Sequence, residues 1–172
     1  MKFETERLIL REYTPEDLPQ LYNMISDPIT MKFYPTTYTH EGSFRWLNWS
    51  LKNYETYGFG WWAVILKENG QYIGDCGITY QNINGQVLPE LGYHLHYPFH
   101  RKGYGKEAAN RVLKWWFEEK GFDEIYSYMT KDNIASSSLA ASVGMKRIDE
   151  FVDEDNIVCF VYKITKEEYI KG

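Results

Sequence analysis

Cysteine is scarce in this sequence of 172 residues, and long apolar runs are absent. The two cysteines, Cys76 and Cys159, lie far apart and form no CxxC pair, which argues against a disulfide framework or a zinc ribbon. No stretch approaches the ~18 consecutive apolar residues of a membrane span, and the opening MKFETERLIL carries charges where a secretory signal needs an apolar run. We therefore expect a cytoplasmic protein with two buried thiols and no membrane partner.

An excess of basic residues is also lacking. Lys and Arg number 19 against 24 Asp and Glu, a net charge of -5, whereas a nucleic-acid surface needs clustered positive charge. We expect no nucleic-acid partner, and this balance suits a cationic acceptor better. The sequence also has no internal repeat, linker or low-complexity segment, and its 44% hydrophobic residues suffice for one core. These features predict a single domain over residues 1–172, as a monomer or homodimer.

The first third of the chain favours one strand and two helices. Residues 7–12 read as a strand, and Thr14 then caps a helix. A second helix begins at Thr39 or Ser43 and runs to about Tyr57, where a glycine follows.

The middle of the chain changes to strand patterns. Three β-rich runs occupy residues 59–66, 72–80 and 87–97, separated by the Asn-Gly pairs at 69–70 and 84–85. Because Asn-Gly is the strongest short hairpin signal, these runs predict an antiparallel meander.

The last third alternates helices and strands. A helical pattern covers residues 104–120, a strand 124–129, a second helix 133–143, and two strands 146–151 and 156–164. The whole order predicts a mixed α/β (α+β) domain, with a largely antiparallel central sheet of about seven strands flanked by about four helices.

The stretch HRKGYGKEAA, residues 100–109, places two glycines and three basic side chains around the start of the helix at 104–120. A helix N-terminus presents unpaired N–H groups and partial positive charge, so a glycine-flanked entry binds phosphate oxygens well. Side chains of Arg101, Lys102 and Lys106 would add charged contacts. The alternative is a tight turn with solvated charges.

Two nucleotide-binding motifs compete for this stretch. A Walker P-loop needs Ser or Thr after Gly-Lys, but Glu107 follows Lys106, which excludes it. Residues 103–108 match the dinucleotide pattern G-x-G-x-x-A, with Asp123 and Glu124 near the expected ribose carboxylate. That pattern belongs after the first strand of repeated βαβ units, whereas here it follows hairpins. A nicotinamide-dependent oxidoreductase is therefore the weaker alternative.

Together with ELGYHLHYPF before it and NIASSSLAASVGMKR after it, the turn resembles the GNAT superfamily of acetyl-CoA-dependent N-acetyltransferases, whose turn pattern is Q/R-x-x-G-x-G/A. The opening ETERLILREYTPEDLPQLYNMISD resembles the branch of ribosomal-protein N-terminal (RimJ/RimL-like) acetyltransferases. Two residues depart from the superfamily: His100 replaces the usual Gln or Arg, and Ala140 replaces a tyrosine that protonates the leaving thiolate in many members. We name no general acid, and a catalytically silent CoA-binding or regulatory module is the alternative function.

The resemblance implies a site for acetyl-CoA as co-substrate. Its pantetheine arm would pair with the strand ending in Leu95 and Tyr97, and the Leu95 N–H would hold the thioester oxygen. Asn133 and Ser136 would contact it from the other side, although helix capping is the alternative for both and nearly as strong for Ser136. Backbone N–H groups of six residues would hold the pyrophosphate: Arg101, Lys102, Gly103, Tyr104, Gly105 and Lys106.

The acceptor must attack as a neutral primary amine, either a protein N-terminus or a small molecule. About 10% of an α-amine is neutral at pH 7, against roughly one lysine side chain in 2,500. Glu90 lies on the strand before the turn, where a glutamate is the base in some members of the superfamily. It is our candidate catalytic residue, and an exposed strand carboxylate is the alternative.

Two further expectations concern the surroundings of Glu90. His94 and His96 share a face with it on a regular strand, but a metal site would need a third ligand such as His100, so we expect no metal. Five aromatic residues are candidates for the acceptor pocket, about half of which should be core instead: Phe33, Tyr34, Tyr57, Trp61 and Trp62.

Overall fold

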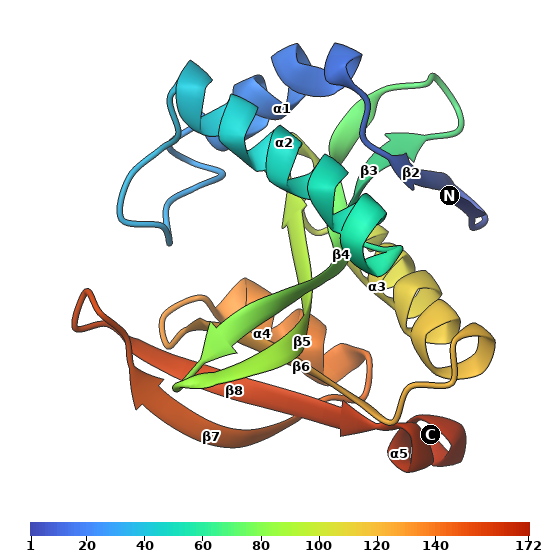
Figure 1. Cartoon of the computed structure of the whole chain (residues 1–172), viewed down its shortest axis with the longest axis vertical. Helices are drawn as coiled ribbons and strands as arrows, with labels where there is room; N and C mark the ends of the chain where they lie inside the picture. Colours follow the sequence, from blue (N-terminus) through green and yellow to red (C-terminus); the bar gives the residue numbers. More distant parts are fainter.

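Eight strands form one sheet in a computed structural model that describes all 172 residues (Figure 1). In sheet order the strands are β1 (Lys2–Glu4), β2 (Leu8–Glu12), β3 (Trp61–Leu66), β4 (Tyr72–Ile83), β5 (Gln86–Leu95), β6 (Glu124–Thr130), β8 (Val158–Thr165) and β7 (Lys146–Val152). The helices are α1 (Leu18–Ile25), α2 (His40–Tyr57), α3 (Tyr104–Lys114), α4 (Ile134–Ser142) and α5 (Lys166–Lys171). None of the helices combines the length and apolar character that a bilayer crossing requires.

The mixed α/β fold with a mostly antiparallel sheet is confirmed, with one strand and one helix more than expected. β1 has only three residues, too few for a periodic pattern, and is held by pairing with β2. α5 has six residues and depends on a capping box between Thr165 and Glu168. These two short elements account for the difference from the expected numbers of about seven strands and about four helices.

Local signals fixed most element ends. The α2 helix begins after Thr39, not Ser43, because the Thr39 hydroxyl accepts the Gly42 N–H at 3.1 Å. The predicted helix through residue 120 is α-helical only to Lys114, and residues 115–119 form a wider π-helical turn. That turn buries three consecutive aromatic residues, which a regular helix would spread around its circumference.

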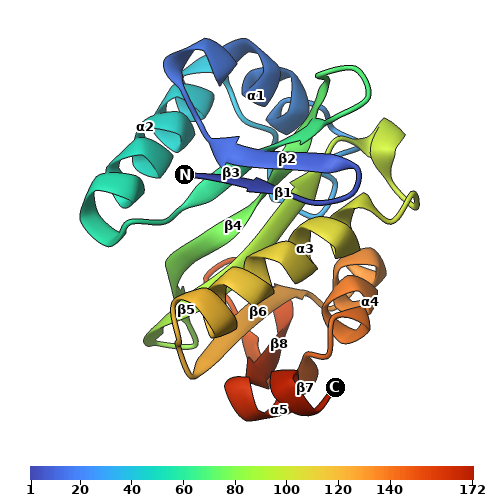
Figure 2. The same cartoon turned by 90° about the vertical axis from the view of Figure 1, so that its right-hand side faces the viewer.

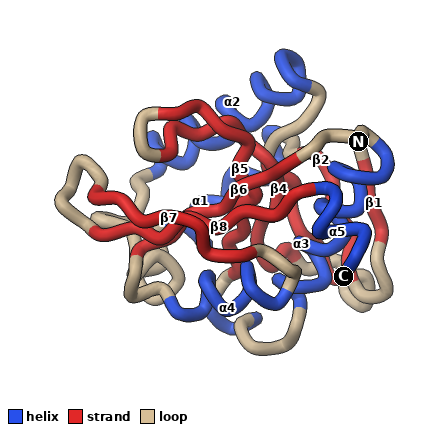
Figure 3. The backbone as a smooth tube through the Cα atoms, turned by 90° about the horizontal axis from the view of Figure 1, so that it is seen from below, coloured by secondary structure: helices blue, strands red, loops and turns tan.

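Helices cover both faces of the sheet (Figures 2 and 3). All six residues of β3 are buried, because alternate side chains enter different cores. Trp62, Val64 and Leu66 pack in the core under α3, whereas Trp61, Ala63 and Ile65 pack under α1 and α2.

β5 and β6 are the one parallel pair, and they are joined at a single register pair, Glu90 opposite Tyr126. β5 pairs with β4, by contrast, through ten residues. The His96 N–H bonds the Ile73 carbonyl at 2.9 Å, so the alternation of ladder bonds directs the N–H and C=O groups of Tyr93 and Leu95 away from β4 and toward β6. Beyond Glu90 the sheet has a gap, called here the β5–β6 gap, lined by main-chain polar groups.

Candidate functional site

The glycine turn, residues 100–106, directs several main-chain N–H groups to one side at the start of α3. β5 ends at Leu95, and residues 97–99 make a short 3-10 turn. Arg101 (φ 59°) and Gly103 (φ 82°) both adopt left-handed backbone before the helix begins at Tyr104. Such alternation turns successive N–H groups to one side, and the helix adds its positive end, so the segment suits an anion. A left-handed arginine is a strained conformation of the kind found at binding sites.

Some side chains of this turn are exposed to solvent, and others contact the rest of the protein. The three basic residues predicted to contact phosphate are all exposed: Arg101, Lys102 and Lys106. His100 instead turns back to the sheet, where its Nε2 lies 2.7 Å from the Leu95 carbonyl oxygen. This residue therefore fastens the turn to the end of β5.

An arginine that the sequence reasoning missed supports the turn from the other side. The Arg7 guanidinium donates to the Lys102 carbonyl at 3.0 Å and to Glu107 Oε2 at 2.7 Å, and lies 4.5 Å above the Tyr104 ring. Burial opposes ionisation of Glu107, but hydrogen bonds from Thr5 and Arg7 hold its pKa below the usual value. No local pattern links Arg7 to a helix about a hundred residues away.

The α4 helix closes the other side of the β5–β6 gap. Tyr93 Oη donates to the Ser136 carbonyl at 2.8 Å and accepts from Ser136 Oγ at 3.3 Å. Asn133 caps the helix by accepting the Ser136 N–H at 3.1 Å. Ala140 is completely buried in the main core. Asn133 and Ser136 thus have structural contacts and also lie on the helix that faces the gap.

Of the two residues predicted to pair with the pantetheine arm, Leu95 ends the strand and Tyr97 lies outside it. It lies in the 3-10 turn after Leu95, where its N–H donates to Thr30 Oγ1 at 3.1 Å and its carbonyl accepts the His100 N–H at 3.0 Å. Its main chain is therefore already used within the protein.

Glu90 lies at the point where β5 and β6 part, and it is only 8% exposed. The alternative of an exposed strand carboxylate is therefore wrong. Burial raises the pKa of Glu90 to about 7, against smaller opposing effects of His94 and the Tyr128 main-chain N–H. A carboxyl group with this pKa changes protonation state near neutral pH, as a general base requires.

On the same face of β5, His94 belongs to a buried hydrogen-bonded network. Its Nδ1 lies 2.8 Å from Asp75 Oδ1, and Asp75 is completely buried. Asp75 Oδ2 accepts from Tyr13 Oη at 2.9 Å, and Tyr13 is hydrogen-bonded to Tyr72 at 2.8 Å. The other ring nitrogen of His94, Nε2, is hydrogen-bonded to the hydroxyl of Tyr34.

Asp75 was not predicted, although a signal for it existed. The Asn84-Gly85 pair makes a two-residue turn with both residues at positive φ, which fixes the register of β4 against β5. Counting equal numbers of residues outward from this turn reaches Asp75 opposite His94.

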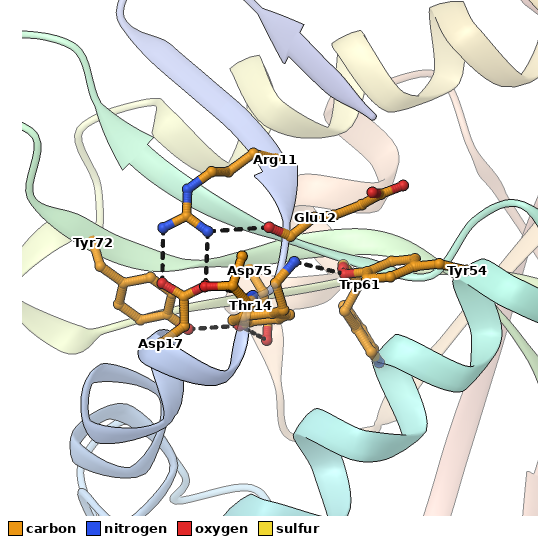
Figure 4. Close-up of polar contacts among 9 residues, drawn as sticks. Arg11, Glu12, Thr14, Asp17, Tyr54, Trp61, Tyr72 and Asp75 are labelled. Atoms are coloured by element: carbon orange, nitrogen blue, oxygen red, sulfur yellow. Dashed lines mark hydrogen bonds and ion pairs between the residues drawn. The ribbon is translucent and has the colours of Figure 1, made fainter.

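A second polar cluster holds α1 and α2 against the sheet near Asp75 and Tyr72 (Figure 4). Arg11 donates two hydrogen bonds of 2.7 Å to the buried carboxylate of Asp17 at the start of α1. Tyr54 on α2 accepts the Tyr13 N–H at 3.0 Å and donates to the Trp61 carbonyl. These bonds position the segment that joins the two helices, residues 26–39, over the face that carries Glu90.

The histidines do not form a metal site. His94 is bonded to Asp75, His96 Nε2 lies 4.0 Å from Asp27, and His100 contacts a carbonyl. No three His, Cys, Asp or Glu side chains lie close enough together to hold an ion.

The predicted pocket aromatics divide between this face, the core and the surface. The Trp61 indole lies over Gly92, where an added Cβ would be 2.1 Å from its Cη2, and Tyr34 lies against His94. The other three lie elsewhere: Trp62 in the core with Phe3 and Trp115, Tyr57 against Phe59 and Tyr80, and Phe33 under Lys32.

Comparison with known proteins places this geometry in context. The Acetyltransferase (GNAT) domain family matches residues 7–146. The Bacillus subtilis (strain 168) protein YkkB is 31% identical over 145 residues, 84% of either chain. An acetyltransferase from Agrobacterium tumefaciens superimposes with a TM-score of 0.83 at 25% identity, covering 95% of this chain and 94% of that one.

A more distant structure shares the fold and holds coenzyme A. It is RimL, a ribosomal L7/L12 α-N-protein acetyltransferase in complex with coenzyme A, with a TM-score of 0.78 at 12% identity, covering 96% and 98% of the two chains.

Proposed function

Since this chain belongs to the GNAT acetyltransferase family, whose members use acetyl-CoA as co-substrate, we propose that it acetylates a cationic primary amine with Glu90 as general base. The observation that carries the proposal is a buried carboxyl group, with a pKa of about 7, at the point where the sheet opens. We also propose that residues 1–172 act as one N-acetyltransferase domain, because the main core includes residues from β1 to β8.

The cofactor would lie across the β5–β6 gap. The main-chain N–H groups of residues 101–106, which include those of Lys102, Gly103 and Gly105, would donate hydrogen bonds to its pyrophosphate. The pantetheine arm would pair with main-chain groups of β5, and the Leu95 N–H would stabilise the thioester oxygen as charge develops on it. Asn133 and Ser136 would contact the cofactor from α4, and Tyr97 would contact it from the turn after β5.

The transfer needs one base and no covalent enzyme intermediate. The incoming ammonium first loses one proton to solvent; the neutral amine nitrogen then attacks the thioester carbonyl carbon and gives a second proton to Glu90, so that an N–C bond forms as the C–S bond breaks. The electron pair of the broken bond leaves with sulfur as a thiolate. A thiol of pKa near ~8.5 is a tolerable leaving group without a dedicated acid.

The charge around Glu90 favours an amine that lacks a neighbouring carboxylate. His94 is the one group of potential positive charge that affects the Glu90 pKa, and Asp75 adds a second carboxylate on this face. An α-carboxylate on the substrate would be repelled by the Glu90 carboxylate, whereas an ammonium group would be attracted to it.

The test is an amine panel followed by release of free thiol from acetyl-CoA. Tyramine with tyrosine, and agmatine with arginine, are pairs that differ only in the carboxylate, and a short peptide represents a protein N-terminus. We expect kcat/KM at least 10-fold higher for the amine of each pair. Preference for the amino acids would contradict the acceptor class, and binding of acetyl-CoA with no turnover on any amine would favour a silent CoA-binding module.

A further inference from the structure

The network from Asp75 to Tyr34 has a direction, which follows from counting donors and acceptors. An ionised carboxylate only accepts hydrogen bonds, so Asp75 takes the proton on His94 Nδ1, 2.8 Å away, and the hydroxyl proton of Tyr13, 2.9 Å away. A neutral imidazole with its proton on Nδ1 has a lone pair on Nε2. In this tautomer of His94, Tyr34 donates its hydroxyl proton to Nε2.

This arrangement leaves the phenolic oxygen of Tyr34 free to accept. Its one proton is directed at His94, and the oxygen retains acceptor capacity on the remaining side. The residue as a whole is 37% exposed while its hydroxyl is buried beside His94, so a substrate would reach the oxygen from the exposed part of the residue. Burial of the hydroxyl and then the charge of Glu90 raise the pKa of Tyr34, so the phenol stays protonated and shares its electrostatic surroundings with the proposed base.

The imidazole is held rigidly from three sides. Asp75 fixes one edge, and the indoles of Trp46 and Trp61 pack on the ring with centroid distances of 5.2 and 4.9 Å. The ring is therefore a fixed point to which a loop residue is attached.

The loop that carries Tyr34 is also attached at two places to the residues that follow β5. Thr30 Oγ1 accepts the Tyr97 N–H at 3.1 Å, and Asp27 lies 4.0 Å from His96 Nε2. Residues 26–39 thus lie along the end of β5, and the bond to His94 determines where the phenol lies relative to Glu90.

We propose that His94 is a positioning residue of the acceptor site: it holds the Tyr34 hydroxyl so that the phenolic oxygen accepts an N–H of the incoming ammonium beside Glu90. This inference rests on the proposed function, since it takes Glu90 to be the base. Aligned dipoles from Asp75 through His94 to Tyr34 strengthen one another, which makes the phenolic oxygen a better acceptor than an isolated tyrosine.

The test is steady-state kinetics of Tyr34→Phe, His94→Gln and the double variant, with the best amine of the panel. We expect Tyr34→Phe to raise the amine KM about 3- to 10-fold, the loss of one hydrogen bond, with the calorimetric Kd for acetyl-CoA unchanged. His94→Gln should have the same effect, and the double variant no more than either single one, because both remove the same contact. Tyr22→Phe, whose ring stacks on His40, is the matched control and should behave as wild type.

Each contrary result has a distinct meaning. An unchanged amine KM in Tyr34→Phe, while Glu90→Gln loses activity, would overturn the role of His94 and leave the proposed function standing. Additive effects in the double variant would also overturn it. Absence of amine turnover by the wild type would instead refute the proposed function. If His94→Gln fails to fold, Tyr34→Phe decides, because it keeps the ring and deletes only the hydroxyl.

Discussion

Glu90 has a carboxyl group whose protonation is set by its burial. Because its pKa lies at about 7, it is about half ionised at neutral pH and becomes a competent base as pH rises. We therefore expect kcat/KM for a given amine to rise through about pH 7 and to reach a plateau above it, once the neutral fraction of the amine is corrected for. Glu90→Gln should remove this rise and most of the activity, measured from pH 5.5 to 9. A variant that keeps the wild-type profile would exclude Glu90 as the base.

The raised pKa of Glu90 also predicts that the variant Glu90→Gln is more stable to unfolding than the wild type. The folded-state pKa lies above the usual carboxyl value of 4.5, so Glu90 favours the folded state below about pH 4.5, and this contribution is lost as pH rises through about 7. The ionised group costs up to about 3 kcal/mol at pH 8. Glu90→Gln should therefore have a Tm up to about 10 °C above wild type at pH 8, and a smaller difference at pH 5.

Residues of the site differ in how far the sequence predicted them. Glu90 and the turn at 101–106 follow from a motif, since their roles depend on local order along the chain. Arg7 and Asp75 act through partners brought near by the folded sheet. The register of one hairpin would have been enough to predict Asp75, whereas predicting Arg7 requires knowledge of how β2 packs against α3.

At the scale of elements, the turn at residues 101–106, proposed to bind phosphate, depends on Arg7 for its shape. Arg7 bonds the Lys102 carbonyl and Glu107, and so joins the β1–β2 connection to the turn and to the first turn of α3. Arg7→Met should weaken acetyl-CoA binding about 3- to 10-fold by calorimetry, because the left-handed turn is no longer held in place. Arg45→Met, which removes an exposed ion pair with Glu41, is the control and should leave Kd unchanged. Equal affinities in all three proteins would show that the turn is rigid without Arg7.

The elements themselves were predicted where local chemistry determines them. Helix caps and Asn-Gly turns act over two to four residues, and the ends of α2 and of the β4–β5 hairpin follow them. The π-helical turn after α3 was missed because it arises from tertiary packing: Trp115, Trp116 and Phe117 are all buried. The short elements β1 and α5 were missed because they are too short to show a periodic pattern and are stabilised by contacts with the rest of the fold.

At the scale of the molecule, the sheet has two parts that meet at Glu90 and Tyr126, but the core does not divide with them. One cluster of 24 buried residues includes Phe3 of β1 and Ile164 of β8. We therefore expect a single calorimetric transition with equal calorimetric and van't Hoff enthalpies. Acetyl-CoA at about a hundredfold over Kd should add about 2.7 kcal/mol and raise Tm by about 5 to 10 °C. Two transitions, of which one alone moves with acetyl-CoA, would contradict a single domain.

In the proposed function β5 separates the two substrates, because residues with odd and with even numbers direct their side chains to opposite faces of the strand. The odd-numbered Leu91, Tyr93 and Leu95 face the core under α3 and α4, on the proposed cofactor side, whereas the even-numbered Glu90 and His94 face the proposed amine side. Insertion or deletion of one residue would exchange the two sets and send the base to the wrong substrate. β5 should therefore tolerate substitution far better than a change of length.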